Sequence, residues 1–398
     1  MKSRIEHFGA IVELPSPLPG LAWVDRERAR SLGLEGGEAW QGEAPSHLSG
    51  PTEVHLVLSR RCDVGCRGCY VDATPRGDQM LVEEARRVID ALAQQGVFHV
   101  AMGGGETLHH EDLFEMAAYA RSRDIVPNLT TSGVGMTEAL AERCRVFGQI
   151  NVSVDAVGKK RGTLSFGEAE RALRLLRAVK KEVGINCVVS RSSYDGIGDV
   201  VRFAKQLRLS EVELLRFKPA GRGASLFARE NLLPSQSRGI YRRALWLAFR
   251  HRMRVKLDCS FAPMIFAHRP SRRAAEFLGV VGCEGGNILA SVMPDGQVVG
   301  CSFGGPNEGS VLEPGHLPAM WKAGFGAFRD YRMNAAEPCR SCEYLQLCKG
   351  GCRVVAQAAG DWSAPDPGCP KVQDYQAREA AAGRRARRTL SVFPPSGT

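Results

Sequence analysis

Three cysteines stand close together near residue 65, at a spacing that suits metal binding. Cys62, Cys66 and Cys69 follow the pattern C-x3-C-x2-C, directly after an apolar run. The count is odd, because a tetrahedral zinc ion or an ordinary ferredoxin cluster takes four protein ligands. Three thiolates on a [4Fe-4S] cluster leave one iron open to another ligand. The motif therefore predicts an iron–sulfur site with one exchangeable position.

A larger set of cysteines occupies the C-terminal part of the chain. Seven of the 13 cysteines follow the order C-x12-G-x4-C, then C-x2-C-x5-C-x3-C, then a final C. They are Cys283, Cys301, Cys339, Cys342, Cys348, Cys352 and Cys369. Four of these thiolates would suit a zinc ribbon, whereas all seven would suit iron–sulfur clusters. The periodicity of apolar residues is weak after residue 258, so metal clusters are expected to stabilise this region.

Strand and helix patterns alternate between residues 53 and 217, which gives six βα units. The expected strands are residues 54–58, 98–102, 126–130, 150–154, 185–189 and 211–217. The expected helices are residues 81–95, 111–121, 138–146, 166–183 and 197–207. Such alternation favours a parallel sheet covered by helices, and six units fall short of the eight in a closed barrel. We therefore expect an α/β fold with a partial (β/α)6 barrel, whose functional groups gather at the carboxyl ends of its strands.

Composition and charge predict a globular, cytoplasmic protein. Hydrophobic residues make up 44% of the chain and charged residues 24%, with no run of 18 apolar residues and no secretory signal. The net charge of +10 partly reflects five arginines in the last 21 residues, with no aromatic residue between them. No membrane or nucleic-acid partner is expected. The expected organisation is an N-terminal extension (1–52), a barrel (53–258), a cysteine-rich domain (259–372) and a basic, flexible tail (373–398).

The stretch Gly103-Gly104-Gly105-Glu106 follows the second expected strand. Glycines let a backbone approach a ligand closely, and a glutamate can accept a hydrogen bond from an ammonium group. On its own, such a stretch is equally typical of a plain turn. Together with the three cysteines of the first motif, it makes the chain resemble the radical S-adenosylmethionine (SAM) enzymes.

This resemblance implies that Cys62, Cys66 and Cys69 bind a [4Fe-4S] cluster whose open iron holds the amino and carboxylate groups of SAM. It also implies that SAM is cleaved to a 5′-deoxyadenosyl radical, which takes a hydrogen atom from the substrate. The residues implied in SAM binding are Tyr70, Gly104, Gly105, Glu106, Ser153 and Arg161. For Ser153 and Arg161 the alternative is an ordinary surface role. Thr107 stands where family members usually carry proline.

The C-terminal cysteines resemble the SPASM extension of radical SAM enzymes that modify peptides and proteins. This extension implies two auxiliary [4Fe-4S] clusters, three clusters in all, with zinc as the alternative. The first would take Cys283, Cys301 and Cys352, and the second Cys339, Cys342, Cys348 and Cys369. Either Cys259 supplies a fourth ligand to the first cluster, or one iron stays open to substrate or water. A buried apolar thiol is the other reading of Cys259, and Cys144 and Cys187 are expected in the core.

Two further positions bear on the substrate. Arg216, Lys218 and Arg222 end the sixth expected strand, where they either hold acidic groups of a substrate or form a solvated basic loop. Ser302 follows Cys301, where sulfatase-maturing relatives carry an aspartate base. Formylglycine formation is therefore disfavoured.

The resemblance implies an oxidoreductase-type enzyme that abstracts hydrogen from a residue of a ribosomally made precursor peptide. The product would be a crosslink, a thioether or a dehydrogenated residue. The alternatives are a small-molecule oxidoreductase or epimerase, and a non-catalytic iron–sulfur or zinc protein. The expected partners are the substrate and a low-potential electron donor of the flavodoxin or ferredoxin type. Leader recognition is expected either on a separate leader-peptide-binding protein or not at all, because residues 1–52 are too few for the leader-binding module of some relatives.

Overall fold

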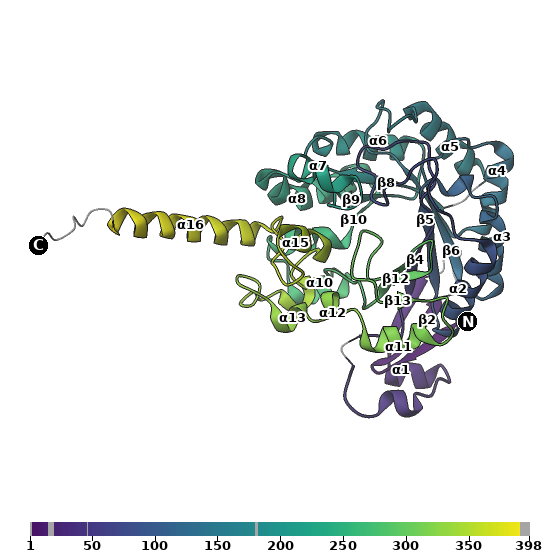
Figure 1. The fold of residues 1–398 in the computed structure, drawn as a ribbon, viewed down its shortest axis with the longest axis horizontal. Coiled ribbons are helices and arrows are strands. Elements are labelled where there is room, and N and C mark those ends of the chain that lie inside the picture. The colour runs from purple at the N-terminus through teal and green to yellow at the C-terminus, as the bar shows by residue number, and fades with distance from the viewer. Residues whose placement is uncertain (1, 15–19, 46, 180–181, 391–398) are drawn as a thin grey trace, which may run out of the picture.

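The computed structural model describes residues 2–14, 20–45, 47–179 and 182–390. Ten strands form one sheet in the order β10-β9-β8-β7-β6-β5-β4-β11-β12-β13. The strands from β4 to β10 are parallel. They are β4 (Glu53–Ser59), β5 (His99–Gly104), β6 (Val126–Thr131), β7 (Gln149–Ser153), β8 (Glu182–Val189), β9 (Glu211–Arg216) and β10 (Arg254–Leu257). The sheet curls with helices on its outer side (Figure 1), so the predicted α/β fold with a partial barrel is confirmed.

Five helices alternate with the parallel strands and cover the outer face. They are α2 (Val82–Gln94), α3 (Leu113–Ser122), α4 (Glu138–Arg143), α5 (Phe166–Ala178) and α6 (Ile197–Gln206). Val54, Leu56 and Leu58 of β4 are at most 1% exposed and belong to the main apolar core. The alternate residues Glu53 and His55 face the inside of the barrel instead. The two-residue period of the strand therefore gives an apolar outer face and a polar inner face.

One predicted helix is too long. The expected helix over residues 166–183 ends at Ala178, and β8 already begins at Glu182. The β-branched run of β8 pairs with β7 on one side and β9 on the other. Pairing with a strand on each side stabilises this segment as a strand, although the spacing of its first apolar residue also fits the preceding helix. After β9 the chain forms α7 (Gly223–Glu230) and α8 (Pro234–His251) before it reaches β10.

The sheet continues into the cysteine-rich part of the chain. Strand β11 (Leu289–Val292) pairs in parallel with β4, and β12 (Gln297–Val299) and β13 (Gly309–Ser310) follow in antiparallel order. The sheet thus crosses the division expected after residue 258, and the domain boundaries stay predictions. Short helices make up much of the rest: α9 (Ala262–Phe266), α10 (Arg272–Phe277), α11 (His316–Ala323), α12 (Gly326–Arg329), α13 (Tyr331–Asn334), α14 (Leu345–Cys348) and α15 (Arg353–Ala359).

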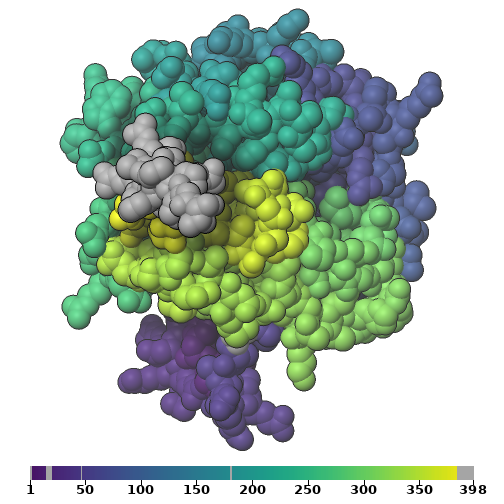
Figure 2. Space-filling model, turned by 60° about the vertical axis from the view of Figure 1, so that its left-hand side comes forward, coloured from purple at the N-terminus to yellow at the C-terminus, as the bar shows by residue number. Residues whose placement is uncertain are grey.

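The N-terminal residues form a small separate sheet. Its strands β1 (Ser3–Glu6), β2 (Gly9–Leu14) and β3 (Gly20–Asp25) are antiparallel, and α1 (Arg26–Ser31) follows them. The Arg4 guanidinium donates to the carbonyl oxygens of Gly50 and Pro51, each at 2.7 Å, and of Gly96 at 3.2 Å. These bonds anchor the purple lobe at the lower edge of Figure 2 to the barrel.

The flexible tail predicted for residues 373–398 stays a prediction, and residues 391–398 of it lie outside the described residues. Helix α16 spans Pro370–Leu390 and extends away from the body of the molecule (Figure 1). Alanine and arginine dominate this stretch, and both are good helix formers. None of the described helices is long and apolar enough to cross a membrane.

Candidate active site

The inside of the barrel holds a cavity of about 560 Å³. Its polar lining comes from most of the parallel strands and includes Glu53, His55, His99, Asn128, Asn151, Asn186, Glu211, Glu213 and Lys256. The interior of an ordinary (β/α) barrel is filled by branched apolar side chains. This barrel instead leaves room for a polar ligand. At the carboxyl ends of the strands the cavity reaches the Cys62–Cys69 loop and the tight turn that begins at Cys301.

The first cysteine motif forms a loop after β4 at the mouth of the cavity. Cys62, Cys66 and Cys69 are partly buried, and none forms a disulfide. The backbone N–H groups of Val64 and Ala73 donate to the sulfurs of Cys62 and Cys69, each at 3.4 Å. Burial raises the pKa of the Cys62 and Cys66 thiols. The loop therefore offers three accessible sulfurs to a metal cluster.

The glycines at the end of β5 let this strand lie directly against the cysteine loop. A Cβ atom on Gly104 would lie 2.3 Å from the Ser59 carbonyl oxygen, and one on Gly105 would lie 2.2 Å from that of Arg61. Gly104 also has a φ of +124°, which favours glycine. The Gly105 N–H donates to the Ser59 oxygen at 2.6 Å. The two backbones thus form one continuous wall at the cavity mouth.

Glu106 connects two loops at the opening of the cavity. Its carboxylate is buried and accepts hydrogen bonds from the Thr131 hydroxyl at 2.5 Å and the Leu108 N–H at 3.1 Å. The second oxygen accepts from the Ser132 N–H at 2.9 Å and from the Ser132 hydroxyl. Two bonds at each oxygen tie the end of β5 to the loop after β6. The expected contact of Glu106 with the SAM ammonium remains a prediction.

The other expected SAM-binding residues lie around the same cavity. Tyr70, Ser153 and Arg161 all line it. The Tyr70 ring packs on Phe303, with ring centroids 4.8 Å apart. Burial alone would lower the pKa of Arg161, but Asp155, 3.2 Å away, and the nearby cysteines raise it overall. Arg161 therefore stays a cation beside the cysteine loop, although part of its charge is already matched by Asp155.

The family model described as the Radical SAM superfamily matches residues 56–204, which carry both the cysteine loop and the glycine turn. The chain belongs to the radical SAM superfamily. As a radical SAM enzyme it uses a [4Fe-4S] cluster and SAM. The three partly buried thiols and the adjoining cavity fit that pair of cofactors.

Relatives of this radical SAM enzyme match it over most of their length. The mycofactocin maturase MftC of Mycobacterium tuberculosis is 27% identical over 379 residues, which cover 87% of this chain and 94% of the relative. The PqqA peptide cyclase of Granulibacter bethesdensis is 28% identical over 360 residues, which cover 85% and 92%.

Solved structures share the fold of the radical SAM enzyme at lower identity. Streptococcus suis SuiB bound to precursor peptide SuiA superimposes with a TM-score of 0.71 at 16% identity, covering 92% of this chain and 98% of SuiB. The enzyme anSMEcpe with bound AdoMet gives 0.61 at 19% identity, covering 86% of this chain and all of that chain. Both share the partial barrel and the cysteine-rich C-terminal region.

The cations after β9 are not free to bind a substrate. Arg216 pairs with Asp366 at 2.7 Å, Lys218 with Asp258 at 2.5 Å and Arg222 with Asp72 at 2.8 Å. The Arg216 and Lys218 side chains are only 1% and 4% exposed. Both readings of these two residues, a substrate clamp and a solvated loop, are therefore wrong. The end of β9 is covered by the cysteine-rich region, and a buried cation there requires an acidic partner.

Cys259 joins the first C-terminal cysteine group of the radical SAM enzyme. Burial raises the pKa of Cys259, and its neighbours Cys283 and Cys352 raise it further. The same two neighbours act on Cys301, where burial is again the main cause and the pKa rises to about 12. Because Cys259 keeps exposed surface although protein surrounds it, the reading of a buried apolar thiol is wrong. Cys144 and Cys187, by contrast, are fully buried in the core, as predicted.

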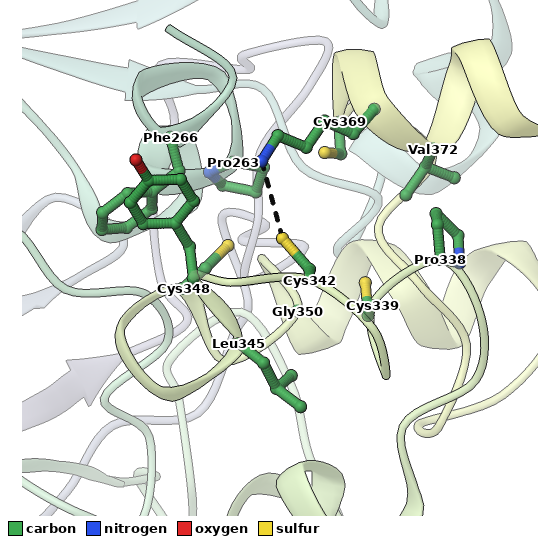
Figure 3. Close-up of a pocket in the computed structure, with 12 residues that line it drawn as sticks. Pro263, Phe266, Pro338, Cys339, Cys342, Leu345, Cys348, Gly350, Cys369 and Val372 are labelled. Atoms are coloured by element: carbon green, nitrogen blue, oxygen red, sulfur yellow. Dashed lines mark hydrogen bonds between the residues drawn. The ribbon is translucent and has the colours of Figure 1, made fainter. Parts of the chain in front are cut away.

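The second C-terminal group lies in a small, mostly apolar pocket of about 30 Å³. Its sulfurs lie around a common space (Figure 3) and belong to Cys339, Cys342, Cys348 and Cys369. Pro263, Phe266 and Val372 close the pocket. The Lys371 ammonium lies 3.7 Å from the Cys342 sulfur, which is the dashed line in Figure 3.

Across the described parts of the chain, no three His, Cys, Asp or Glu side chains converge tightly enough to hold a single metal ion. Thiolate ligands of one zinc ion lie about 2.3 Å from the metal. A four-iron cluster is larger and holds its thiolates farther apart.

Sequence reasoning missed two features of the cavity. His55 contacts Ser302 and Glu53, which lie on different parts of the cavity wall. Glu213 lines the cavity and has no hydrogen bond or ion pair with any described residue, and burial, with Asp258 nearby, raises its pKa to about 7. A signal was available, because alternate residues of β4 and β9 are polar, whereas buried parallel strands are usually apolar on both faces.

Proposed function

We propose that this enzyme removes hydrogen from a residue of a ribosomally made precursor peptide and leaves a crosslink, a thioether or a dehydrogenated residue. The observation that carries the proposal is the polar cavity of about 560 Å³, which borders the Cys62–Cys69 loop and the turn after Cys301. The names of the relatives support it, since they are a mycofactocin maturase and a peptide cyclase. SuiB, which shares the fold, is described bound to its precursor peptide.

In this proposal the chain's residues bind and shield the reacting groups. Cys62, Cys66 and Cys69 would hold the cluster, which together with SAM would supply the radical chemistry that removes a hydrogen atom from the substrate. The backbone carbonyl and N–H groups around Gly104, together with Arg161, hold the amino-acid part of SAM. The packed rings of Tyr70 and Phe303 keep water from the mouth of the cavity.

The C-terminal region, residues 259–372, would hold two auxiliary [4Fe-4S] clusters and accept the second electron from the substrate. We assign Cys259 as the fourth ligand beside Cys283, Cys301 and Cys352, because Cys283 and Cys352 lie near enough to act on both Cys259 and Cys301. The other cluster takes the four cysteines of the apolar pocket. A low-potential donor of the flavodoxin or ferredoxin type would supply electrons from outside.

The test uses the anaerobically reconstituted enzyme with SAM, dithionite and the short peptide encoded beside its gene. The expected result is release of 5′-deoxyadenosine together with loss of two hydrogens from the peptide, measured by mass spectrometry. A peptide of shuffled sequence is the control, and it should stay unchanged. A separately encoded leader-binding protein is added in a parallel reaction.

The polar lining of the cavity also suits a small polar metabolite, which is the second candidate substrate class. Release of 5′-deoxyadenosine without any change in the peptide, with or without the leader-binding protein, would favour that class. No release of 5′-deoxyadenosine at all would contradict both candidates.

A further inference from the structure

Three polar residues form a hydrogen-bonded chain along one wall of the cavity. The Ser302 hydroxyl lies 3.1 Å from His55 Nδ1, and His55 Nε2 lies 3.4 Å from Glu53 Oε1. All three line the cavity. Ser302 is the second residue of the turn Cys301–Gly304, whereas His55 and Glu53 share the inner face of β4. The chain thus joins residues 247 positions apart in the sequence.

The position of these three residues would let a proton leave the cavity. Ser302 is 7% exposed and lies next to Cys301, whereas the side chains of His55 and Glu53 are 31% and 38% exposed. Glu53 is the first residue of β4, so the chain leads from the cysteine end of the cavity toward the amino end of the barrel. Burial alone would raise the pKa of Glu53, but its contact with His55 and the charges of His99 and Lys256 lower it overall.

Glu53 therefore stays ionised and can stabilise an imidazolium at His55. His99 of β5 and Lys256 of β10 also act on Glu53, but Lys256 is already bound by Glu211 at 2.8 Å. Ala101 and Ser291, the strand neighbours of His55 on either side, carry no charge. The carboxylate of Glu53 is thus the charged partner of His55.

We propose that Ser302, His55 and Glu53 form a proton relay that takes the proton which the substrate loses when it is oxidised in the cavity. This rests on the proposed function, which makes the substrate lose a hydrogen atom first.

After hydrogen abstraction, the substrate carbon radical loses one electron to a one-electron acceptor of the iron–sulfur class. The N–H or O–H group on the neighbouring atom gives its proton to the Ser302 oxygen, and a C=N or C=O bond forms. Ser302 passes its own proton to His55 Nδ1, which leaves an imidazolium facing the Glu53 carboxylate. The substrate is oxidised by two electrons overall, one lost with the hydrogen atom and one to the acceptor.

The first test measures the exchange rates of individual histidine ring C2 hydrogens in the reconstituted enzyme by mass spectrometry. Glu53→Gln should change the exchange rate of His55, because it removes the neighbouring anion. The matched control is the exposed pair His316 and Glu313, 2.7 Å apart, whose exchange in E53Q should stay unchanged. An unchanged His55 in E53Q would overturn the relay, and this result does not depend on the substrate.

The second test follows product and 5′-deoxyadenosine together, with the precursor peptide named above. His55→Gln should slow product formation about 100-fold and Ser302→Ala about 10-fold, as expected for loss of a positioned base, while 5′-deoxyadenosine release continues. Ser302→Thr keeps the hydroxyl and should restore product, and His316→Gln should behave as the wild type. Wild-type product rates in H55Q and S302A would overturn the relay. Failure of the wild type to modify the peptide would instead contradict the proposed function and leave the histidine measurement to decide on the relay.

Discussion

The first and the last groups of cysteines along the chain lie in different environments. The Cys62–Cys69 loop, here called the open site, is partly buried and borders a polar cavity of about 560 Å³. The Cys339–Cys369 group, here called the closed site, lines a largely apolar pocket of about 30 Å³. A centre with an exchangeable ligand needs room beside its thiolates, whereas a centre that only carries electrons or braces the fold does not. The difference in space supports the proposal that the open site reacts and the closed site has a supporting role.

Removing one ligand from each site tests this comparison most strongly. Cys69→Ala should lower the release of 5′-deoxyadenosine by at least about 100-fold, because the cluster that holds SAM loses a ligand. Cys342→Ala should release 5′-deoxyadenosine near the wild-type rate but yield little modified peptide. Chromatographic assay of both products, with iron content measured for each variant, separates the two roles. Equal loss of 5′-deoxyadenosine release in both variants would remove the functional distinction between the sites.

A buried ion pair connects the barrel that carries the open site to the region that carries the closed one. Asp366 binds Arg216 of β9 through both oxygens, at 2.7 and 3.1 Å. It also accepts from the backbone N–H groups of Cys352 and Gly368, at 3.0 and 2.8 Å. Burial would lower the pKa of Arg216, but Asp366 raises it overall, so the guanidinium stays charged. Asp366→Asn should therefore cost about 3–5 kcal/mol, since it leaves a buried charge unpaired.

The matched control for this pair is the exposed contact between Arg238 and Asp374, which are 2.6 Å apart. Asp374→Asn should change stability by less than about 1 kcal/mol, because water screens an exposed pair. Anaerobic thermal unfolding of both variants measures the difference. Similar midpoints for D366N and D374N would mean that the two regions are not held together through Asp366.

The sequence was sufficient to predict the barrel, because the barrel rests on local patterns. The cluster sites at the two cysteine groups rest on local patterns too and stay predictions. The apolar, β-branched runs marked the parallel strands, and the spacing of Cys62, Cys66 and Cys69 marked the open site. The partners of Arg216 and His55 lie 150 and 247 residues away, so no local pattern reveals them. Without its partner in view, Arg216 resembles a substrate-binding cation.

The polar cavity beside the open site also affects stability through Glu213. Burial, with Asp258 as the next cause, raises the pKa of Glu213 from 4.5 to about 7. A raised pKa favours the folded state below pH 4.5, and this advantage is lost as the pH rises from 4.5 to 7. At pH 8 the ionised Glu213 should cost about 3 kcal/mol relative to the neutral form.

Glu213→Gln should therefore raise the unfolding midpoint at pH 8 but not at pH 4.5, in thermal scans across this range. Glu211→Gln is the control on the same strand, because Glu211 binds Arg254 and Lys256 at 3.1 and 2.8 Å. It should lower the midpoint at pH 8. A gain in E213Q that does not depend on pH would show that the Glu213 carboxyl does not titrate in this window.

The smallest expected effect concerns the charge beside the closed site. The Lys371 ammonium lies 3.7 Å from the Cys342 sulfur and 3.6 Å from Glu343. A positive charge near a cluster stabilises its more negative, reduced form, so Lys371→Met should lower the reduction potential there. The shift should be tens of millivolts, because about 59 mV corresponds to a tenfold change for one electron and Glu343 offsets part of the charge. Lys371→Arg keeps the charge and should keep the potential, as measured by anaerobic redox titration with electron paramagnetic resonance. A matching shift in the cluster of the open site would contradict the separation of the two sites, because Lys371 contacts only the closed one among the described cysteines.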